Sequence, residues 1–184
     1  METNSFDLGI APGGLREKAD IKLLVCYLLK TIGKTLTRTQ INDAFQENQI
    51  ANYFEINAAI SELIEGGQVG CEDIDGEQYL TVSLRTSIEV LEIENLLPRS
   101  IREKAVNAGL KIYNRDKIKK ESEVEVVDLR QGHHVTFRIF DMGTKLFELT
   151  IYVADSSQIE IVKTNFFDNA VSIYSDLISA LTVK

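Results

Sequence analysis

The stretch that decides the fold is Asn52-Tyr-Phe-Glu-Ile-Asn-Ala-Ala-Ile-Ser-Glu-Leu-Ile-Glu-Gly-Gly67. Asn52 is a good helix N-cap, with Glu55 three residues later, and Gly66-Gly67 is a typical end. The apolar residues between them recur at intervals of three and four, so they share one face of a helix. That inward face consists of Ile56, Ala59, Ile60, Leu63 and Ile64.

Two more helices are predicted before this one. The first, from about Arg16 to Ile32, has a single apolar stripe and should end at Gly33. The second begins at the capping box Thr37-Arg-Thr-Gln40, in which the Thr hydroxyl and the Gln side chain each bond to the other residue's backbone N–H. It runs to about Glu47. Residues 1–14 lack apolar periodicity and are predicted to form an arm.

A hairpin is predicted after the third helix. Two short strands, 68–71 and 78–84, are predicted on either side of Ile74-Asp-Gly-Glu77, in which Asp75-Gly76 is a pair typical of tight hairpin turns. Three helices followed by a hairpin predict a winged helix-turn-helix domain over residues 1–85, including the arm. A helical bundle with an unrelated hairpin is the alternative.

Residues 86–120 are predicted to be a helical connector and a dimerisation element. Capping boxes at Thr86-Ser-Ile-Glu89 and Ser100-Ile-Arg-Glu103 should each open a helix, with Pro98 separating the two. Gly109 should weaken the second helix. The first helix carries Ile88, Leu91, Leu96 and Leu97, and the second turns Ile101, Ala105, Ala108 and Ile112 inward.

The apolar period changes to two beyond Glu121, which predicts three strands separated by turns at Gln131-Gly132 and Met142-Gly143. A fourth capping box, Ser157-Gln-Ile-Glu160, should open a long terminal helix. Residues 121–184 are therefore expected to form an antiparallel sheet covered by that helix, and the whole chain is α+β. The helix stripe contains Ile159, Val162, Phe166, Ala170, Ile173, Leu177 and Leu181.

The sequence resembles an uncharacterised bacterial winged-helix family catalogued as domain of unknown function 4364. The resemblance rests on Asn52-Tyr-Phe with Ser61-Glu-Leu-Ile-Glu-Gly-Gly67, on Leu97-Pro-Arg-Ser-Ile-Arg-Glu-Lys104, and on Ala170-Val-Ser-Ile-Tyr174. It covers essentially the whole chain. The resemblance implies a transcriptional regulator and transfers no catalytic residue.

The net charge of −8 opposes general affinity for nucleic acid or anionic membranes, because both favour a positive protein surface. The first residues contain no basic segment followed by an apolar run, and no later run is long enough to span a membrane, so we expect a cytoplasmic protein. Cys26 and Cys71 have no ligand partners nearby in the sequence and are expected to be buried, reduced thiols.

If the third helix binds DNA, few side chains are suitable. Phosphate contacts would fall to Lys34 and Arg38, with help from Lys30, and an asparagine can bond bidentately to adenine. The candidate DNA-binding residues are Lys34, Arg38, Asn52, Asn57 and Ser61, with Asn52 also serving as the cap.

A second candidate for phosphate contacts is the segment 99–120, which contains eight basic residues and two acidic ones, Glu103 and Asp116. The simpler interpretation is a solvated helix face. These residues are Arg99, Arg102, Lys104, Lys111, Arg115, Lys117, Lys119 and Lys120.

The third helix and the hairpin carry an acidic face, which repels phosphate and favours a different function. The protein is either a homodimeric DNA-binding regulator or an interaction module that uses this face to bind a basic protein surface. The acidic residues are Glu55, Glu62, Glu65, Glu72, Asp73, Asp75 and Glu77.

An enzyme is the third class considered. The sequence contains no nucleophile elbow, glycine-rich phosphate loop or metal-ligand spacing, so we expect no catalytic activity, cofactor or metal. His133-His134 is the one pair to weigh. Adjacent residues of a regular strand point to opposite faces, so these two histidines should not bind one metal together.

Overall fold

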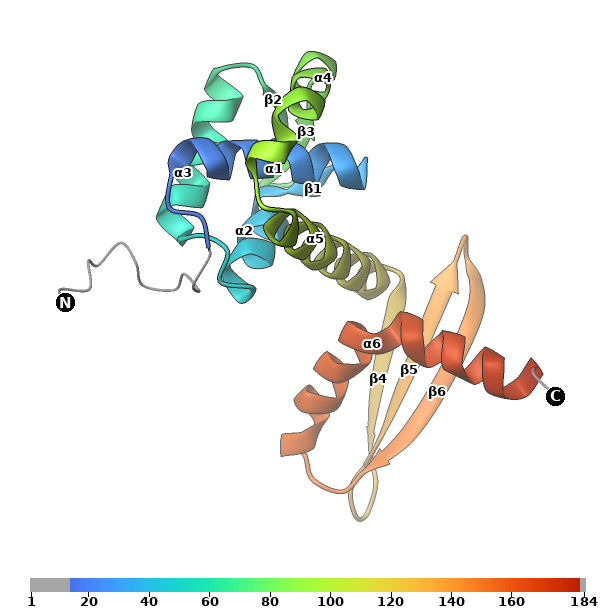
Figure 1. Cartoon of the computed structure of the whole chain (residues 1–184). Coiled ribbons are helices and arrows are strands. Elements are labelled where there is room, and N and C mark those ends of the chain that lie inside the picture. Colours follow the sequence, from blue (N-terminus) through green and yellow to red (C-terminus); the bar gives the residue numbers. More distant parts are fainter. Residues whose placement is uncertain (1–13, 183–184) are drawn as a thin grey trace. The chain divides into compact units, whose positions relative to one another are not determined.

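The computed structural model describes residues 14–182, in which six α-helices and two three-stranded antiparallel sheets form an α+β protein (Figure 1). The chain divides into two compact units, with the boundary between Tyr113 and Asn114. This boundary falls inside helix α5 (Arg99–Lys120). The arm expected at the N-terminus lies almost entirely outside the described residues.

The first three helices of the N-terminal unit lie where the sequence predicts them: α1 (Lys18–Ile32), α2 (Arg38–Glu47) and α3 (Tyr53–Glu65). Their caps are also confirmed. Gly33 adopts the left-handed conformation that ends α1, with φ of 62°. Both bonds of the Thr37–Gln40 capping box are present, and Asn52 accepts the Phe54 N–H at 2.8 Å.

The predicted hairpin consists of β2 (Val69–Ile74) and β3 (Glu77–Val82). Asp75 and Gly76 both have positive φ, as a tight hairpin turn of this kind requires. A third strand was not predicted: β1 (Leu36–Thr37) pairs with β3, so the sheet order is β1-β3-β2. A strand of two residues is too short to show the alternation of apolar and polar residues by which strands are recognised in a sequence.

The helices after the hairpin are present, but their predicted caps are wrong. Helix α4 (Leu84–Ile93) is capped by Ser83, whose hydroxyl accepts the Thr86 N–H, and Thr86 is buried inside the helix. A short 3-10 helix, Glu94–Leu96, follows. Helix α5 starts at Arg99, two residues earlier than a Ser100 cap would allow, because the Pro98 carbonyl already accepts the Ile101 and Arg102 N–H groups.

The core of the N-terminal unit surrounds α1, which buries Ile21, Leu24, Val25, Cys26, Leu28 and Leu29. The inward face of α5 packs into the same core. At Gly109 a Cβ would lie 2.9 Å from methyl carbons of Leu28 and Ile32, so the glycine permits close approach of α5 to α1.

One of the two cysteine predictions is wrong. Cys26 is buried, and burial raises the pKa of its thiol to about 11. Cys71 is exposed. It lies on β2, where Val69 is buried and residues 70–74 are exposed, because this part of the hairpin extends beyond the core.

The C-terminal unit contains the predicted meander, formed by β4 (Ser122–Asp128), β5 (His133–Asp141) and β6 (Thr144–Val153) in the order β4-β5-β6. Val124, Phe137 and Leu149 lie side by side across the three strands. The phenyl ring of Phe137 stacks on that of Phe166 from the terminal helix, with 4.0 Å between ring centroids.

The terminal helix α6 (Ser157–Thr182) differs from its prediction at its start and in how much of its apolar stripe is buried. Ser157 is its first residue rather than its cap, and the Asp155 carboxylate accepts the Ser157 N–H at 2.8 Å. Hydrogen bonds from the backbone and the side chain of Ser157 hold the pKa of Asp155 below its usual range. Only Phe166 and Ala170 are buried, because the predicted stripe continues beyond the part of α6 that packs on the sheet.

Candidate nucleic-acid interface

Helices α2 and α3 are joined by a set of polar contacts. The amide side chains of Asn42 and Asn57 donate to each other's oxygen, at 3.2 and 3.0 Å, and Asn42 is almost fully buried. The guanidinium of Arg38 donates to the Ser61 hydroxyl at 2.8 Å. Because buried polar groups are costly when unpaired, these contacts fix how α3 lies on α2.

Most of the polar residues predicted to contact DNA therefore have partners within the protein. Asn57 is held by Asn42 and also donates to the Tyr53 carbonyl, while Asn52 caps α3. Of the predicted phosphate contacts near α2, Arg38 is half-buried against Ser61, whereas Lys34 is exposed.

Part of the predicted acidic face is neutralised. Glu62 forms ion pairs with Lys18, at 2.9 Å, and with Lys22, both of which belong to α1. Hydrogen bonds from Lys22 and Lys18 lower the pKa of Glu62, and the same contact raises the pKa of Lys18. Glu55 is half-buried and Glu65 is exposed on the same helix.

The acidic residues of the hairpin remain at the surface. Glu72, Asp73 and Asp75 are exposed, and Glu77 is half-buried. Asp73 accepts the Gly76 N–H at 3.1 Å, which supports the turn. The tip of the β2–β3 hairpin is therefore the most strongly acidic part of this surface.

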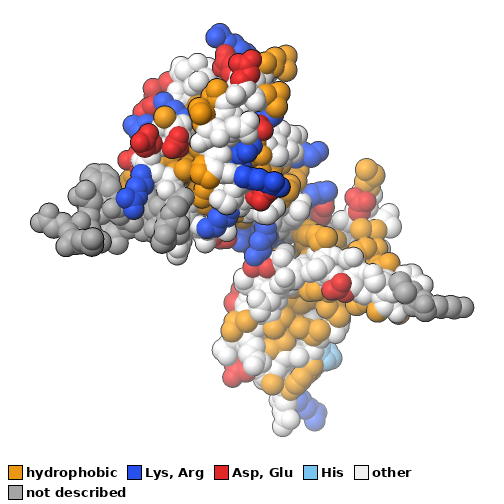
Figure 2. All heavy atoms as spheres, viewed as in Figure 1, with side chains coloured by type: hydrophobic (Ala, Val, Ile, Leu, Met, Phe, Trp, Pro, Cys, Tyr) orange, Lys and Arg blue, Asp and Glu red, His pale blue; other side chains and the backbone are white. Residues whose placement is uncertain are grey.

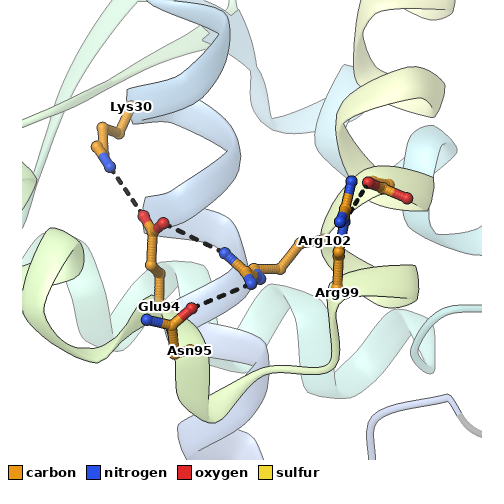
Figure 3. Close-up of polar contacts among 6 residues, drawn as sticks. Lys30, Glu94, Asn95, Arg99 and Arg102 are labelled. Atoms are coloured by element: carbon orange, nitrogen blue, oxygen red, sulfur yellow. Dashed lines mark hydrogen bonds and ion pairs between the residues drawn. The ribbon is translucent and has the colours of Figure 1, made fainter.

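The N-terminal part of α5 is committed to internal contacts (Figure 3). Glu94 accepts hydrogen bonds from Lys30 at 2.9 Å and from Arg102 at 3.2 Å, and Arg102 also donates to Asn95. The Arg102 side chain is only 14% exposed. Arg99 pairs with Glu103 at 2.7 Å, and this hydrogen bond raises the pKa of Arg99. Arg102 consequently serves the fold of this unit.

The remaining basic residues of α5 have varied surroundings. Lys104 and Lys111 are exposed and line a shallow hollow with Glu47 and Asn48 at the end of α2. In the C-terminal unit, three of the predicted phosphate contacts meet protein partners: Arg115 lies beside Asp116 and Asp168, Lys117 beside Glu121, and Lys119 over the Phe167 ring. Lys120 is exposed.

Two exposed apolar surfaces lie on the N-terminal unit; the sequence predicted a dimerisation role for the one on α4, whereas the aromatic pair on α3 was not recognised as functional. Tyr53 and Phe54 are exposed at the start of α3, Phe54 to 75%, with their rings edge to face. Helix α4 turns Leu84, Ile88 and Leu91 to solvent. The available signal for the aromatic pair was its position outside the apolar stripe of α3.

The two adjacent histidines contact different residues. His133 contacts the Asp128 carboxylate at 2.7 Å, and the His134 ring stacks edge to face on Tyr152. Among residues 14–182, no group of three His, Cys, Asp or Glu side chains is placed to hold a metal ion. The helices within the described range also include none long and apolar enough to cross a membrane.

The fold and these surfaces define an α+β protein of two units, of which the first presents α3 and an acidic hairpin. Over residues 21–181 the chain matches the model of a family described as a domain of unknown function (DUF4364), and it belongs to that family. No curated protein and no solved structure matches the chain.

Proposed function

We propose that residues 18–82 form a winged helix-turn-helix and that the protein is a transcriptional regulator which binds DNA as a homodimer. The observation that supports this most directly is the order helix, strand, helix, helix, strand, strand with sheet order β1-β3-β2. In this arrangement α3 is the second helix of the helix-turn-helix, the one that enters the major groove in such proteins, and β2–β3 is the wing.

The charge on α3 is compatible with this role once its contacts are considered. Lys18 and Lys22 offset the charge of Glu62, and Lys34 is an exposed cation near the start of α2. The exposed Tyr53 and Phe54 add apolar surface, which in a major groove contacts thymine methyl groups. The acidic wing weakens phosphate binding, so we expect low affinity that falls steeply with salt.

Fluorescence anisotropy with labelled genomic duplex fragments, at low and moderate salt, tests DNA binding. Replacing Lys34 with Gln should weaken binding and reduce the slope of log K against log salt by about 0.9, the value for one lost phosphate contact. Lys145→Gln on β6 is the matched control, since it removes the same charge from the other unit. No binding by the wild-type protein at low salt would contradict the proposal.

Helix α4 supports the homodimer part of the proposal. Leu84, Ile88 and Leu91 follow one another at intervals of four and three residues, so their exposed side chains share one helix face. Contiguous exposed apolar surface of this kind commonly marks a protein interface. Light scattering should find that the double variant Ile88→Gln/Leu91→Gln lowers the mass in solution relative to the wild-type protein, whereas a 20.7 kDa wild-type monomer would argue against it.

The alternative function is a winged-helix module that binds a basic protein surface and no DNA. The exposed Glu72, Asp73 and Asp75 at the wing favour it. Reversing the charge of Glu65 and Glu72 to Lys separates the two functions: DNA binding should strengthen, whereas a complex with a basic partner should weaken. Glu62 is left unchanged because it pairs with two lysines of α1.

A further inference from the structure

The second half of α6 carries an apolar surface that the C-terminal unit leaves uncovered. Val171 is 62% exposed and Leu181 is 75% exposed, and Ile178 between them is also at the surface. Figure 2 shows apolar side chains gathered on this unit beside α6. An apolar patch of this extent on a folded domain commonly marks an interaction site.

The spacing along this surface specifies a helical partner. Val171, Tyr174, Ile178 and Leu181 are separated by three, four and three residues, which is the a/d repeat of helices that pack knobs into holes. The exposed side chains of this seam lie on one side of α6, next to the stripe that faces the sheet. The surface therefore matches another α-helix rather than a strand or a small polar ligand.

An apolar hollow of about 140 Å³ lies beside the start of this seam. The hollow is lined by apolar parts of Ile118, Ile139, Leu146, Phe147, Ala170, Val171 and Tyr174. The volume is close to that of the cavity of ~150 Å³ known to hold a benzene molecule, so one branched aliphatic side chain fits it. No side chain of residues 14–182 fills this hollow, so it can accept a side chain from another molecule.

We propose that α6 forms a second self-association surface, in which Leu181 of each copy enters the hollow of the other copy. Leu181 is seven residues beyond Tyr174, or about 10 Å along the helix axis. An antiparallel pair with its two-fold axis near Ile178 brings each Leu181 opposite the partner's Tyr174. A single two-fold axis then fills both hollows, as an isologous interface requires.

The charge distribution favours a second copy of this chain over an unrelated helix. Among residues 171–182 only Asp176 is charged, and it occupies the repeat position that faces away from the seam. Ser175, Leu177 and Thr182, the residues that flank the seam there, are uncharged. Self-pairing therefore meets no like-charge repulsion, and the seam lacks the flanking charges that select a different partner.

Disulfide cross-linking of the full-length chain tests this geometry directly. One chain carries Leu181→Cys and a second, larger tagged chain carries Leu146→Cys, both with Cys71→Ser and with Ile88→Gln/Leu91→Gln to disable α4. Cys26 stays, because burial raises the pKa of its thiol to about 11 and keeps it unreactive. Mixing under mild oxidation should give the mixed disulfide between the two chains.

The same proteins give a second measurement, the mass in solution. With α4 disabled, the chain should remain a dimer through α6, and adding Leu181→Gln or Val171→Gln should yield a monomer. Ser179→Gln is the matched control, since it places the same side chain on the same helix away from the seam. Circular dichroism checks that each variant is folded.

Other outcomes overturn the inference. Disulfides only between two Leu181→Cys chains would indicate parallel helices and an empty hollow. Absence of cross-links together with a monomer would show that α6 does not pair with itself. Because α4 is disabled throughout, neither result depends on whether the protein binds DNA or dimerises through α4.

Discussion

Helix α1 of the N-terminal unit is surrounded by other elements, whereas helix α6 of the C-terminal unit is packed on one side over part of its length. Six of the 15 residues of α1 are buried, against two of the 26 residues of α6. Both helices have apolar residues at intervals of three and four. The spacing therefore identifies which face of a helix is apolar. Whether that face is buried depends on an opposing surface.

The difference has a consequence for stability. The N-terminal unit obtains its hydrophobic stabilisation within one chain, because its core draws on all five of its α-helices. The apolar core of the C-terminal unit, among the residues the structure describes, consists of Val135, Phe137, Val153, Phe166 and Ala170. Since a small core gives little stability, we expect the second unit to depend more on association with a partner.

The largest expected effect is a cavity in the N-terminal core. Phe45 is completely buried, so Phe45→Ala should cost about 3–5 kcal/mol of the free energy of unfolding. Hydrogen exchange should show lost protection in residues 18–113 and retained protection in 122–182. Phe54→Ala, the same change at an exposed position, is the control. Equal loss of protection in both units would mean that they unfold together, and the contrast between a self-sufficient and a dependent unit would be wrong.

The Glu94 contacts should have the next largest effect. Glu94→Gln leaves Lys30 and Arg102 without their countercharge in a mostly buried place, which should cost about 1–3 kcal/mol. Glu103→Gln removes the exposed partner of Arg99 and should cost below about 1 kcal/mol. Urea unfolding measures both. Equal costs would show that the Glu94 contacts contribute no more to the stability of the N-terminal unit than the exposed Arg99–Glu103 pair does.

Much of the N-terminal unit was predictable because its signals are local. The Thr37 capping box, the Asn52 cap and the Asp75-Gly76 turn each depend on residues within four positions of one another. Strand β1 was missed because it exists only through pairing of Leu36 with the distant Leu80. The exposure of α6 was missed because a stripe does not reveal where the sheet beneath it ends.

The candidate interface was only partly predictable for the same reason. The sequence identified Arg38, Asn57 and Ser61 as polar residues near α3, but it did not reveal that these side chains bond across α2 and α3. The Asn42–Asn57 pair joins residues 15 positions apart, and Glu62 meets lysines of α1. Such partners meet only when the helices pack against one another, and these contacts determine which side chains remain at the surface.

Capping in the N-terminal unit tests the limits of such local signals. Ser83→Ala removes the hydroxyl that accepts the Thr86 N–H and should cost about 1 kcal/mol. Ser100→Ala, at the position where the sequence predicted a cap, should cost nothing or stabilise slightly, because Ser100 lies within α5 and Ala favours helix. Thermal unfolding distinguishes them. If Ser100→Ala cost more stability than Ser83→Ala, the caps predicted from the sequence would be the correct ones.

The smallest expected effect is a pH dependence in each unit. Lys22 and Lys18 lower the pKa of Glu62 in the N-terminal unit, while Lys145 and Arg138 lower that of Glu148 on β6. A carboxylate with a lowered pKa stabilises the folded state above its unfolded pKa, near 4.3, and this contribution is lost as the pH falls through the folded pKa. Stability should therefore decrease between about pH 5 and pH 3.

Glu62→Gln and Glu148→Gln assign this pH dependence to the units, and each variant is the control for the other. Hydrogen exchange at several pH values should show a flatter profile for α3 in the first variant and for β6 in the second. Because both carboxylates are solvent-accessible, salt should weaken both effects. If Glu62→Gln flattened the profile of β6 as well, the two units would share one unfolding equilibrium, and the independence inferred from their separate cores would be wrong.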